Sequence, residues 1–314
     1  MKIKDLKLGP NYLAGFVSEL RECQTARGDS YISFRLSDKE DKIDVKIWQT
    51  QIGEIEKLNI KNGSFVVAKG ICQLYKEKKQ FTVEKDNKIK LREVNEEDNI
   101  DINDYMAIAP IDFEEIRDYL IDAINMIVDS EIREFTMKIF DDYHDELIRF
   151  PASINVHHDY KNGLGYHLYR MVKSAIKLKD VYERVNFDYI IAGVIIHDIG
   201  KIKCYKITDS GAPEDYTLEN SLIGHIPMGL IMIESYELSE EKKNLMRHLL
   251  LSHHGREEFG AIVPPMFIEA EILHMLDMMD SKITIMENVL DGLEPGEVSD
   301  RIWTLDRAKI YKLK

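Results

Sequence analysis

The sequence predicts a multidomain protein in which a small all-β domain at the N-terminal end is followed by an all-α domain. Apolar and polar residues alternate in short runs up to about residue 92, whereas from residue 113 the apolar residues recur at helical spacing. The charge changes as well. Residues 1–92 hold 19 Lys and Arg against 13 Asp and Glu, a net charge of +6, and because the whole chain carries −14, the rest carries −20. A basic part joined to an acidic part is typical of proteins with a polyanion-binding domain.

Length and composition bound the class of protein. With 314 residues, of which 44% are hydrophobic, the chain is long enough for several domains with apolar cores. No apolar run approaches the length of a membrane span, and the first residues lack the apolar centre of a signal peptide, so we expect a cytoplasmic protein without membrane contact. The cysteines Cys23, Cys72 and Cys204 are scattered, which indicates neither a disulfide framework nor a zinc ribbon.

The first domain, residues 1–92, is predicted to contain short strands and one helix. From Tyr12 to about Leu91 the pattern is strand-like, and turn-forming residues separate the runs. The expected strands include residues 31–36, 43–48, 65–71, 72–75 and 80–83. A short helix is expected at residues 51–58. Counted from the strand-like segment that starts at Tyr12, the helix falls between the third and the fourth runs, which is the order of a five-stranded oligonucleotide-binding (OB) barrel.

Such a barrel would bind a single strand through aromatic and basic side chains on its surface. The aromatic candidates are Tyr31, Phe34, Trp48, Tyr75 and Phe81. The basic candidates are Arg35, Lys46, Lys69 and Lys78, with Lys76 and Lys79 in the same turn. The alternative is that these aromatic residues form the barrel core and that the lysines are an ordinary solvated face.

An acidic, turn-rich linker is expected at residues 93–104, and a helical domain at residues 105–314. The main helices are predicted at residues 113–128, 132–143, 164–182, 189–197, 226–236, 240–252 and 266–290. An apolar tail at residues 302–311 is expected to pack on the helical domain or on another subunit.

The stretch at residues 194–201 organises this second domain. It is an apolar run that closes on His197 and Asp198, followed at once by Gly200 and Lys201. Burying an imidazole and a carboxylate without partners is costly. Either a metal ion satisfies both groups, or His197 is hydrogen-bonded in the core beside an N-capping Asp198.

The other histidines favour the metal. All ten lie between residues 144 and 274, and the basic part contains none. The candidate positions near predicted helix ends are His167, His197 with Asp198, His225, His253 with His254, and Asp277, which has His274 and Asp280 nearby. Imidazole and carboxylate together suit Mn, Fe, Co or Zn, and this set is large enough for two ions.

The order His167, then His197 and Asp198, then a distant Asp277 resembles the HD phosphohydrolase superfamily of helical, metal-dependent enzymes. The additional His225 and the pair His253 and His254 resemble the members that hold two metals. With a basic OB domain ahead of it, the chain is similar from about residue 12 to residue 311 to the YhaM-type 3′→5′ exoribonucleases. Residues 157–164 and 277–282 extend the similarity.

The resemblance implies a ligand set for two ions. One ion would be held by His167, His197, Asp198 and Asp277, and the other by His225, His253 and His254, with Asp198 as the bridge and a catalytic residue. Mn is the first expectation, with Fe, Co, Zn or Mg as alternatives.

Other residues near these ligands receive expected roles. Lys201 would stabilise the substrate phosphate, unless it is an exposed lysine at a helix end. His158 or His157 would contact the phosphate or protonate the leaving group, and His274 would buttress Asp277. Where the family often has a glycine and a glutamate before the first ligand, this chain has Asn162 and Tyr166.

The function implied is metal-dependent 3′→5′ exonucleolytic hydrolysis of single-stranded RNA, with DNA as an alternative substrate and a homo-oligomer as an open alternative. A second hypothesis is a cyclic-dinucleotide or nucleotide phosphodiesterase, although the Gly-Tyr-Pro signature of the former is absent after His254. A third is a non-catalytic single-strand-binding scaffold.

Overall fold

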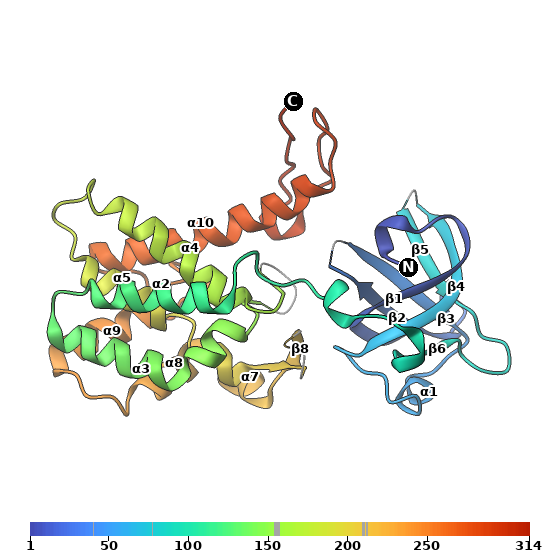
Figure 1. Ribbon diagram of the computed structural model, residues 1–314, viewed down its shortest axis with the longest axis horizontal. Helices are drawn as coiled ribbons and strands as arrows, with labels where there is room; N and C mark the ends of the chain where they lie inside the picture. The colour runs from blue at the N-terminus through green and yellow to red at the C-terminus, as the bar shows by residue number, and fades with distance from the viewer. Residues whose placement is uncertain (40, 77, 154–157, 209–210, 212) are drawn as a thin grey trace. The chain divides into compact units, whose positions relative to one another are not determined.

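A computed structural model of the protein describes residues 1–39, 41–76, 78–153, 158–208, 211 and 213–314 (Figure 1). The contacts divide the chain into two compact units. Unit 1 comprises Met1–Ile108 with Ile207–Asp215, and unit 2 comprises Ala109–Lys206 with Tyr216–Lys314. Unit 1 therefore extends past the boundary expected at residue 92. None of the helices in the described ranges combines the length and the apolarity needed to cross a bilayer.

Unit 1 is built on a six-stranded sheet with the strand order β1-β2-β3-β5-β4-β6, which closes because β1 also pairs with β4. Its strands are β1 (Gly9–Gln24), β2 (Ser30–Ser37), β3 (Lys42–Trp48), β4 (Phe65–Tyr75), β5 (Lys78–Val83) and β6 (Leu91–Glu93). The helix α1 (Ile52–Glu56) lies between β3 and β4. Only β3 and β5 pair in parallel within this sheet, as described. This confirms the predicted OB-type barrel.

One predicted strand is wrong. Residues 72–75 are not a separate strand but the continuation of β4, which runs unbroken from Phe65 to Tyr75. The register Gly70↔Val83 continues to Tyr75↔Lys78, so the whole second half of β4 pairs with β5. Gly70 permits this continuity, because a Cβ there would lie 2.1 Å from the carbonyl oxygen of Thr82.

The strand alternation decides which aromatic residues of the barrel are exposed. On β2, Ile32, Phe34 and Leu36 point inward, and Phe34 is only 2% exposed. Phe81 on β5 is completely buried. Because successive side chains of a strand point to opposite faces, Phe34 cannot share the outer face with Tyr31. The expectation that Phe34 and Phe81 contact a nucleic-acid strand is therefore wrong, and both belong to the barrel core.

The segment after β6 packs on the outside of the barrel. Tyr105 and Met106 are buried in a small cluster with Ala14 and Phe16 of β1. The rings of Phe65 and Tyr105 lie 5.4 Å apart. These contacts are why residues 93–108 group with unit 1.

Unit 2 is helical, and the predicted helices are present. Its longer helices are α2 (Phe113–Asn125), α3 (Ser130–Arg149), α4 (Gly163–Leu178), α5 (Phe187–Ile196), α8 (His225–Ile233), α9 (Glu240–Ser252) and α10 (Ile268–Asp291). The short helices are α6 (Lys201–Cys204) and α7 (Leu218–Leu222). The strands β7 (Tyr205–Ile207) and β8 (Pro213–Tyr216), which the sequence pattern does not predict, form a two-stranded sheet.

The helix α5 is central in unit 2. It packs against α2, α3, α4, α9 and α10, and every residue from Ile190 to Ile196 is buried. An all-round apolar helix is stable only when other elements cover it on every side. The end of α5, where the apolar run gives way to His197 and Asp198, is thereby enclosed by the surrounding helices.

The apolar tail forms a hairpin beyond α10. Two bridges, Val298↔Tyr311 and Ile302↔Ala308, pair its arms. Lys312 donates to the carbonyl oxygens of Leu290 and Leu293 at the end of α10. Trp303 at the hairpin's turn stays 74% exposed, with the Arg307 guanidinium 4.2 Å from its ring centroid.

Candidate metal centre

The end of α5 places an imidazole and a carboxylate in the interior of unit 2. His197 is the C-cap of α5 and Asp198 follows it. Both residues are buried, with at most 2% of their surface exposed. His197 Nδ1 lies 2.8 Å from the carbonyl oxygen of Val194, so it carries the hydrogen and donates there. This leaves Nε2 facing Asp198, 3.1 Å from Oδ2.

A glycine lets the next turn of the chain approach α8. The turn after Asp198 brings Gly200 so close to His225 that a Cβ at Gly200 would lie 1.9 Å from the His225 carbonyl oxygen. Without a side chain at this position, His225 at the start of α8 can lie with its Nε2 3.7 Å from Asp198 Oδ1. Gly200 thus joins two ligand-bearing segments that are far apart in the sequence.

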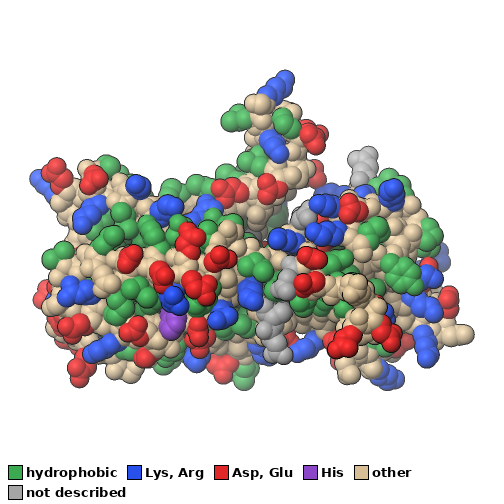
Figure 2. Space-filling view, in the orientation of Figure 1, with side chains coloured by type: hydrophobic (Ala, Val, Ile, Leu, Met, Phe, Trp, Pro, Cys, Tyr) green, Lys and Arg blue, Asp and Glu red, His purple; other side chains and the backbone are tan. Residues whose placement is uncertain are grey.

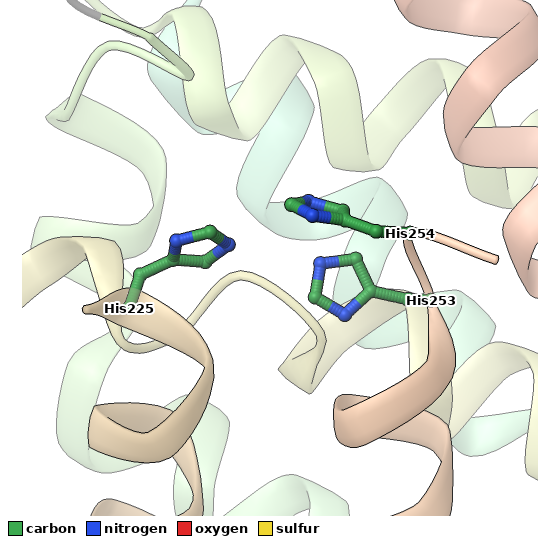
Figure 3. Close-up of side chains that lie close together, drawn as sticks. All are labelled: His225, His253 and His254. Carbon is green, nitrogen blue, oxygen red and sulfur yellow. The ribbon is translucent and has the colours of Figure 1, made fainter. Parts of the chain in front are cut away.

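Three histidines converge beside Asp198. His225 comes from α8, and His253 and His254 come from the end of α9, with their rings turned toward one shared space (Figure 3). One nitrogen from each of the three lies within 4.8 Å of the others. His253 repeats the arrangement of His197, because its Nδ1 donates to the carbonyl oxygen of Leu250 and its Nε2 lies 3.9 Å from Asp198 Oδ1.

Helices α4 and α10 supply the other side of the centre. His167 on α4 is fully buried, and its Nε2 lies 3.3 Å from Asp277 Oδ1 on α10. His167 also groups with His197 and Asp198, with one potential ligand atom of each within 4.8 Å of the others. Asp198 therefore has His167 and His197 on one side and His225 and His253 within 4 Å of its Oδ1 on the other.

The unsatisfied atoms of this region test whether the residues fit a metal. Five buried atoms make no hydrogen bond to any described residue: His197 Nε2, Asp198 Oδ1, His225 Nε2, His253 Nε2 and His254 Nδ1. Buried polar atoms are almost always satisfied in proteins, and a cluster of five exceptions needs an explanation. Imidazole nitrogens and a carboxylate oxygen aimed into one space are the donor set of a divalent transition-metal ion. The residues fit a divalent metal site.

Charges in the site also favour cation binding. Burial would raise the pKa of Asp198, but Lys201 and His197 hold it well below its usual value, so the carboxylate is ionised. Burial, with neighbouring His254 and His197, lowers the pKa of His253 well below its usual value. Burial also lowers the pKa of His225 to about 4. For Asp198, His225 and His253, these are the protonation states that bind a metal.

Lys201 is not an exposed lysine at a helix end. It is 6% exposed, and its Nζ lies 2.6 Å from Asp198 Oδ2 and donates to the carbonyl oxygen of Ala152 at 2.7 Å. The ammonium group is therefore fixed on the side of Asp198 opposite Oδ1, and its first partner is the carboxylate.

His158 contacts residues around Asp280. It is fully buried, with Nδ1 2.6 Å from the Tyr160 hydroxyl and Nε2 2.8 Å from Asp280 and 3.0 Å from Thr284. Both ring nitrogens are thus engaged by protein groups, and this position does not support the expected role in protonating a leaving group. His157, the other candidate for that role, lies outside the described residues.

Sequence reasoning named Asp280 but missed its role. Its Oδ2 accepts from His167 Nδ1 at 2.7 Å, and its Oδ1 lies 2.5 Å from Arg170 Nε. The spacing from Asp277 to Asp280 could have indicated this, since residues three apart share a helix face. The contact that the structure gives His274 is with His253, whose carbonyl oxygen lies 2.9 Å from His274 Nδ1.

Unit 1 carries its own candidate surface on the outer face of β2 and β3. The rings of Tyr31 and Trp48 lie 4.9 Å apart, and Lys46 Nζ lies 4.9 Å from the Tyr31 centroid. Trp48 is 43% exposed and Tyr75 is 55% exposed. Lys78 is exposed beside Tyr75 in the β4–β5 pair.

Two other basic candidates on unit 1, Arg35 and Lys69, are paired with acids, and Lys79 donates to the carbonyl oxygen of Leu6. Arg35 lies 2.8 Å from Glu19 and 3.4 Å from Asp44, and Lys69 lies 3.2 Å from Glu84. Lysines and acidic residues are interspersed over the visible face of the molecule (Figure 2). Tyr31, Lys46 and Trp48 therefore form the best-defined aromatic and basic cluster among the candidates.

Comparisons with known proteins agree with this picture. Residues 164–281, which contain all of the ligand candidates from His167 to Asp277, match a family model described as HD domain. A relative named 3′-5′ exoribonuclease YhaM from Oceanobacillus iheyensis is 31% identical over 94% of this chain and 92% of its own length. Proteins of the same name from Listeria welshimeri and Bacillus subtilis are 33% and 30% identical, each over 91% of this chain and 90% of their own length.

Proposed function

The chain belongs to the YhaM family of 3′-5′ exoribonucleases, and from this premise we propose that it removes nucleotides from the 3′ end of single-stranded RNA by metal-dependent hydrolysis of phosphodiester bonds. The observation that carries the proposal is the set of five unsatisfied buried atoms around Asp198. A vestigial helical domain in a binding scaffold would have no reason to keep these atoms unsatisfied.

Two ligand groups are proposed for two divalent ions. His167, His197, Asp198 and Asp277 would hold one ion, and His225, His253 and His254 would hold the other. When bound, such ions activate a water as the nucleophile at neutral pH and neutralise charge on the phosphate. The mixture of imidazole and carboxylate ligands suits Mn, Fe, Co or Zn, and we take Mn as the first metal to test.

The chain's own residues prepare this site. Asp198 offers Oδ1 toward His225 and His253, while Oδ2 is held by Lys201 and faces His197. Lys201 thereby keeps the carboxylate ionised and fixes its rotation. The hydrogen bonds from His197 and His253 to backbone carbonyls hold the two rings so that Nε2 of each faces inward.

The barrel is proposed to hold the RNA strand. Trp48 and Tyr31 present ring faces on which bases can stack, at about 1–3 kcal/mol per base. Lys46 beside them, with Lys78 near Tyr75, would contact phosphates. Every base has a π-face that can stack on an aromatic ring, so this mode of binding predicts little dependence on RNA sequence.

Asp198→Asn tests the site. The substitution keeps the shape of the side chain but removes the charge, so we expect hydrolysis of a 3′-labelled or 5′-labelled single-stranded RNA to be abolished while binding of the strand is retained. Product ladders from the two labels report the direction, and matched DNA and each candidate metal are run in parallel. Wild-type hydrolysis by Asp198→Asn would refute the metal assignment.

Trp48→Ala tests the barrel, and the chain provides a matched control in its other tryptophan. We expect Trp48→Ala to weaken strand binding about 5–150-fold, the equivalent of one stacked base. Trp303→Ala removes a more exposed tryptophan from unit 2 and is expected to leave binding unchanged. Equal effects of the two substitutions would contradict the proposed role of the β2–β3 face.

A further inference from the structure

We propose that Asp280, anchored by Arg170, is a positioning residue that fixes which nitrogen of His167 faces the metal centre, and that His158 belongs to the same supporting cluster rather than to the chemistry. This inference rests on the metal-dependent function proposed above. It concerns the buried group of His158, His167 and Asp280, in which one potential ligand atom of each lies within 4.8 Å of the others, and the hydrogen bonds within this group carry the inference.

Asp280 contacts three neighbouring side chains in the interior of unit 2. The side chain is 5% exposed, and its Oδ2 lies 2.7 Å from His167 Nδ1 and 2.8 Å from His158 Nε2. Its Oδ1 lies 2.5 Å from Arg170 Nε. Three groups that can donate hydrogen bonds therefore surround one buried carboxylate.

The contact with Asp280 determines which ring nitrogen of His167 carries the hydrogen. An ionised carboxylate only accepts hydrogen bonds, so the hydrogen in the contact with Asp280 must be on Nδ1 of His167. The opposite nitrogen, Nε2, then points toward Asp277 Oδ1 at 3.3 Å and toward the other ligands. Metal-bound histidines commonly donate their second nitrogen to a carboxylate in this way, which fixes the ring and makes it a better ligand.

The same spacing of three residues occurs on α4 and on α10. Arg170 is three residues beyond His167 on α4, and Asp280 is three residues beyond Asp277 on α10. Residues three apart lie on the same helix face, one turn away. The Arg170–Asp280 pair thus joins α4 and α10 one turn from the two candidate ligands, and Arg170 is held in turn by Glu287 at 2.8 Å.

His158 is hydrogen-bonded at both of its ring nitrogens. Its Nε2 donates to Asp280, so its Nδ1 is the acceptor for the Tyr160 hydroxyl at 2.6 Å. Thr284 Oγ1 also lies 3.0 Å from Nε2. A ring that is fully buried and bonded at both nitrogens holds Asp280 in place and has no nitrogen directed at a substrate.

Asp280→Asn separates positioning from packing. The amide has nearly the shape of the carboxylate, but one of its two ends is an NH₂ donor. If that end faces Arg170, donor meets donor there, and if it faces the histidines, His167 loses the acceptor that fixes Nδ1–H. Either orientation weakens the control over His167.

The metal affinity is the primary measurement, and it needs no RNA. Titration of metal-free full-length protein with Mn²⁺, followed by calorimetry, is expected to show an affinity about 10–100-fold weaker for Asp280→Asn than for the wild type. Asp291→Asn, at the exposed end of the same helix, is the matched control and is expected to keep the wild-type affinity. Wild-type affinity in Asp280→Asn would overturn the inference.

A second readout is the state of the His167 ring. The ¹⁵N shifts of its two nitrogens in the wild type loaded with diamagnetic Zn²⁺ are expected to show hydrogen on Nδ1, and this signature should be weakened or lost in Asp280→Asn. If Asp280→Asn does not fold, Arg170→Gln takes its place, because it keeps Asp280 ionisable but loosens it. Its Mn²⁺ affinity should fall in the same direction, and an unchanged affinity would also overturn the inference.

Hydrolysis distinguishes positioning from catalysis. At saturating Mn²⁺, Asp280→Asn should recover most of its kcat, because Asp280 does not contact the substrate. His158→Gln, whose amide can still donate to Asp280, should likewise retain kcat, whereas a loss of kcat at saturating metal with normal Mn²⁺ affinity would show that His158 is a proton donor after all. If the wild type binds Mn²⁺ but does not cleave RNA, the proposed function fails while the affinity and ¹⁵N comparisons still decide the role of Asp280.

Discussion

Lys201→Met should destabilise the metal-free protein and be rescued by divalent metal. Lys201 and Asp198 are 6% and 2% exposed, and their charged atoms lie 2.6 Å apart. Removing one partner of a buried ion pair leaves an uncompensated charge and costs about 3–5 kcal/mol. In unit 2, which spans about 200 residues, this corresponds to a fall in Tm of about 6–20 °C. Calorimetric unfolding after chelation measures it.

Added Mn²⁺ should restore much of that loss, since cations beside Asp198 replace the missing ammonium charge. Lys282→Met, an exposed lysine on α10, is the matched control and is expected to change stability by less than about 0.5 kcal/mol. A metal-free Lys201→Met protein that unfolds within 1 °C of the wild type would refute the reasoning from the buried pair.

Three further outcomes are expected. Phe81→Ala should destabilise unit 1 by about 3–5 kcal/mol, as seen in denaturant unfolding, whereas Trp48→Ala should leave its stability nearly unchanged. Gly200→Ala should reduce Mn²⁺ binding in calorimetric titration, because its Cβ would meet the His225 carbonyl oxygen at 1.9 Å and push α8 away. Chelation of the wild type should abolish RNA hydrolysis in a gel assay and lower the Tm of unit 2, and full activity in excess chelator would contradict the proposed function.

The order of the elements could be predicted from the sequence because burial leaves a periodic pattern. The run from Ile190 to Ile196 is apolar on all sides, and in the structure it is the covered helix α5. The strands β7 and β8 were missed because three or four residues are too few to show a period. The sequence predicts separate strands at residues 65–71 and 72–75 because Gly70 interrupts the strand pattern. In the structure the backbone continues through Gly70 as the single strand β4.

The site was less predictable than the fold. His197, Asp198 and Asp277 are of residue types that bind metals, which the sequence shows directly. Whether these side chains come together depends on the tertiary structure, which the sequence does not show. The same limit applies to the aromatic residues of the barrel. Phe34 lies in the core and Trp48 lies on the surface, and the strand register alone decides this. Lys201 shows it as well, because nothing in the sequence states that its ammonium group turns inward to Asp198.

The cost of the unsatisfied atoms links the chemistry to the fold. Each buried polar atom without a partner costs about 1–3 kcal/mol, so the five around Asp198 amount to about 5–15 kcal/mol if nothing meets them. That sum is as large as the whole stability of a typical domain. The candidate ligands come from the ends of α5 and α9 and from α4, α8 and α10, so a cation that satisfies them would also join these helices. Metal binding and the packing of unit 2 are therefore expected to stabilise each other, with the gain in stability rising with metal concentration.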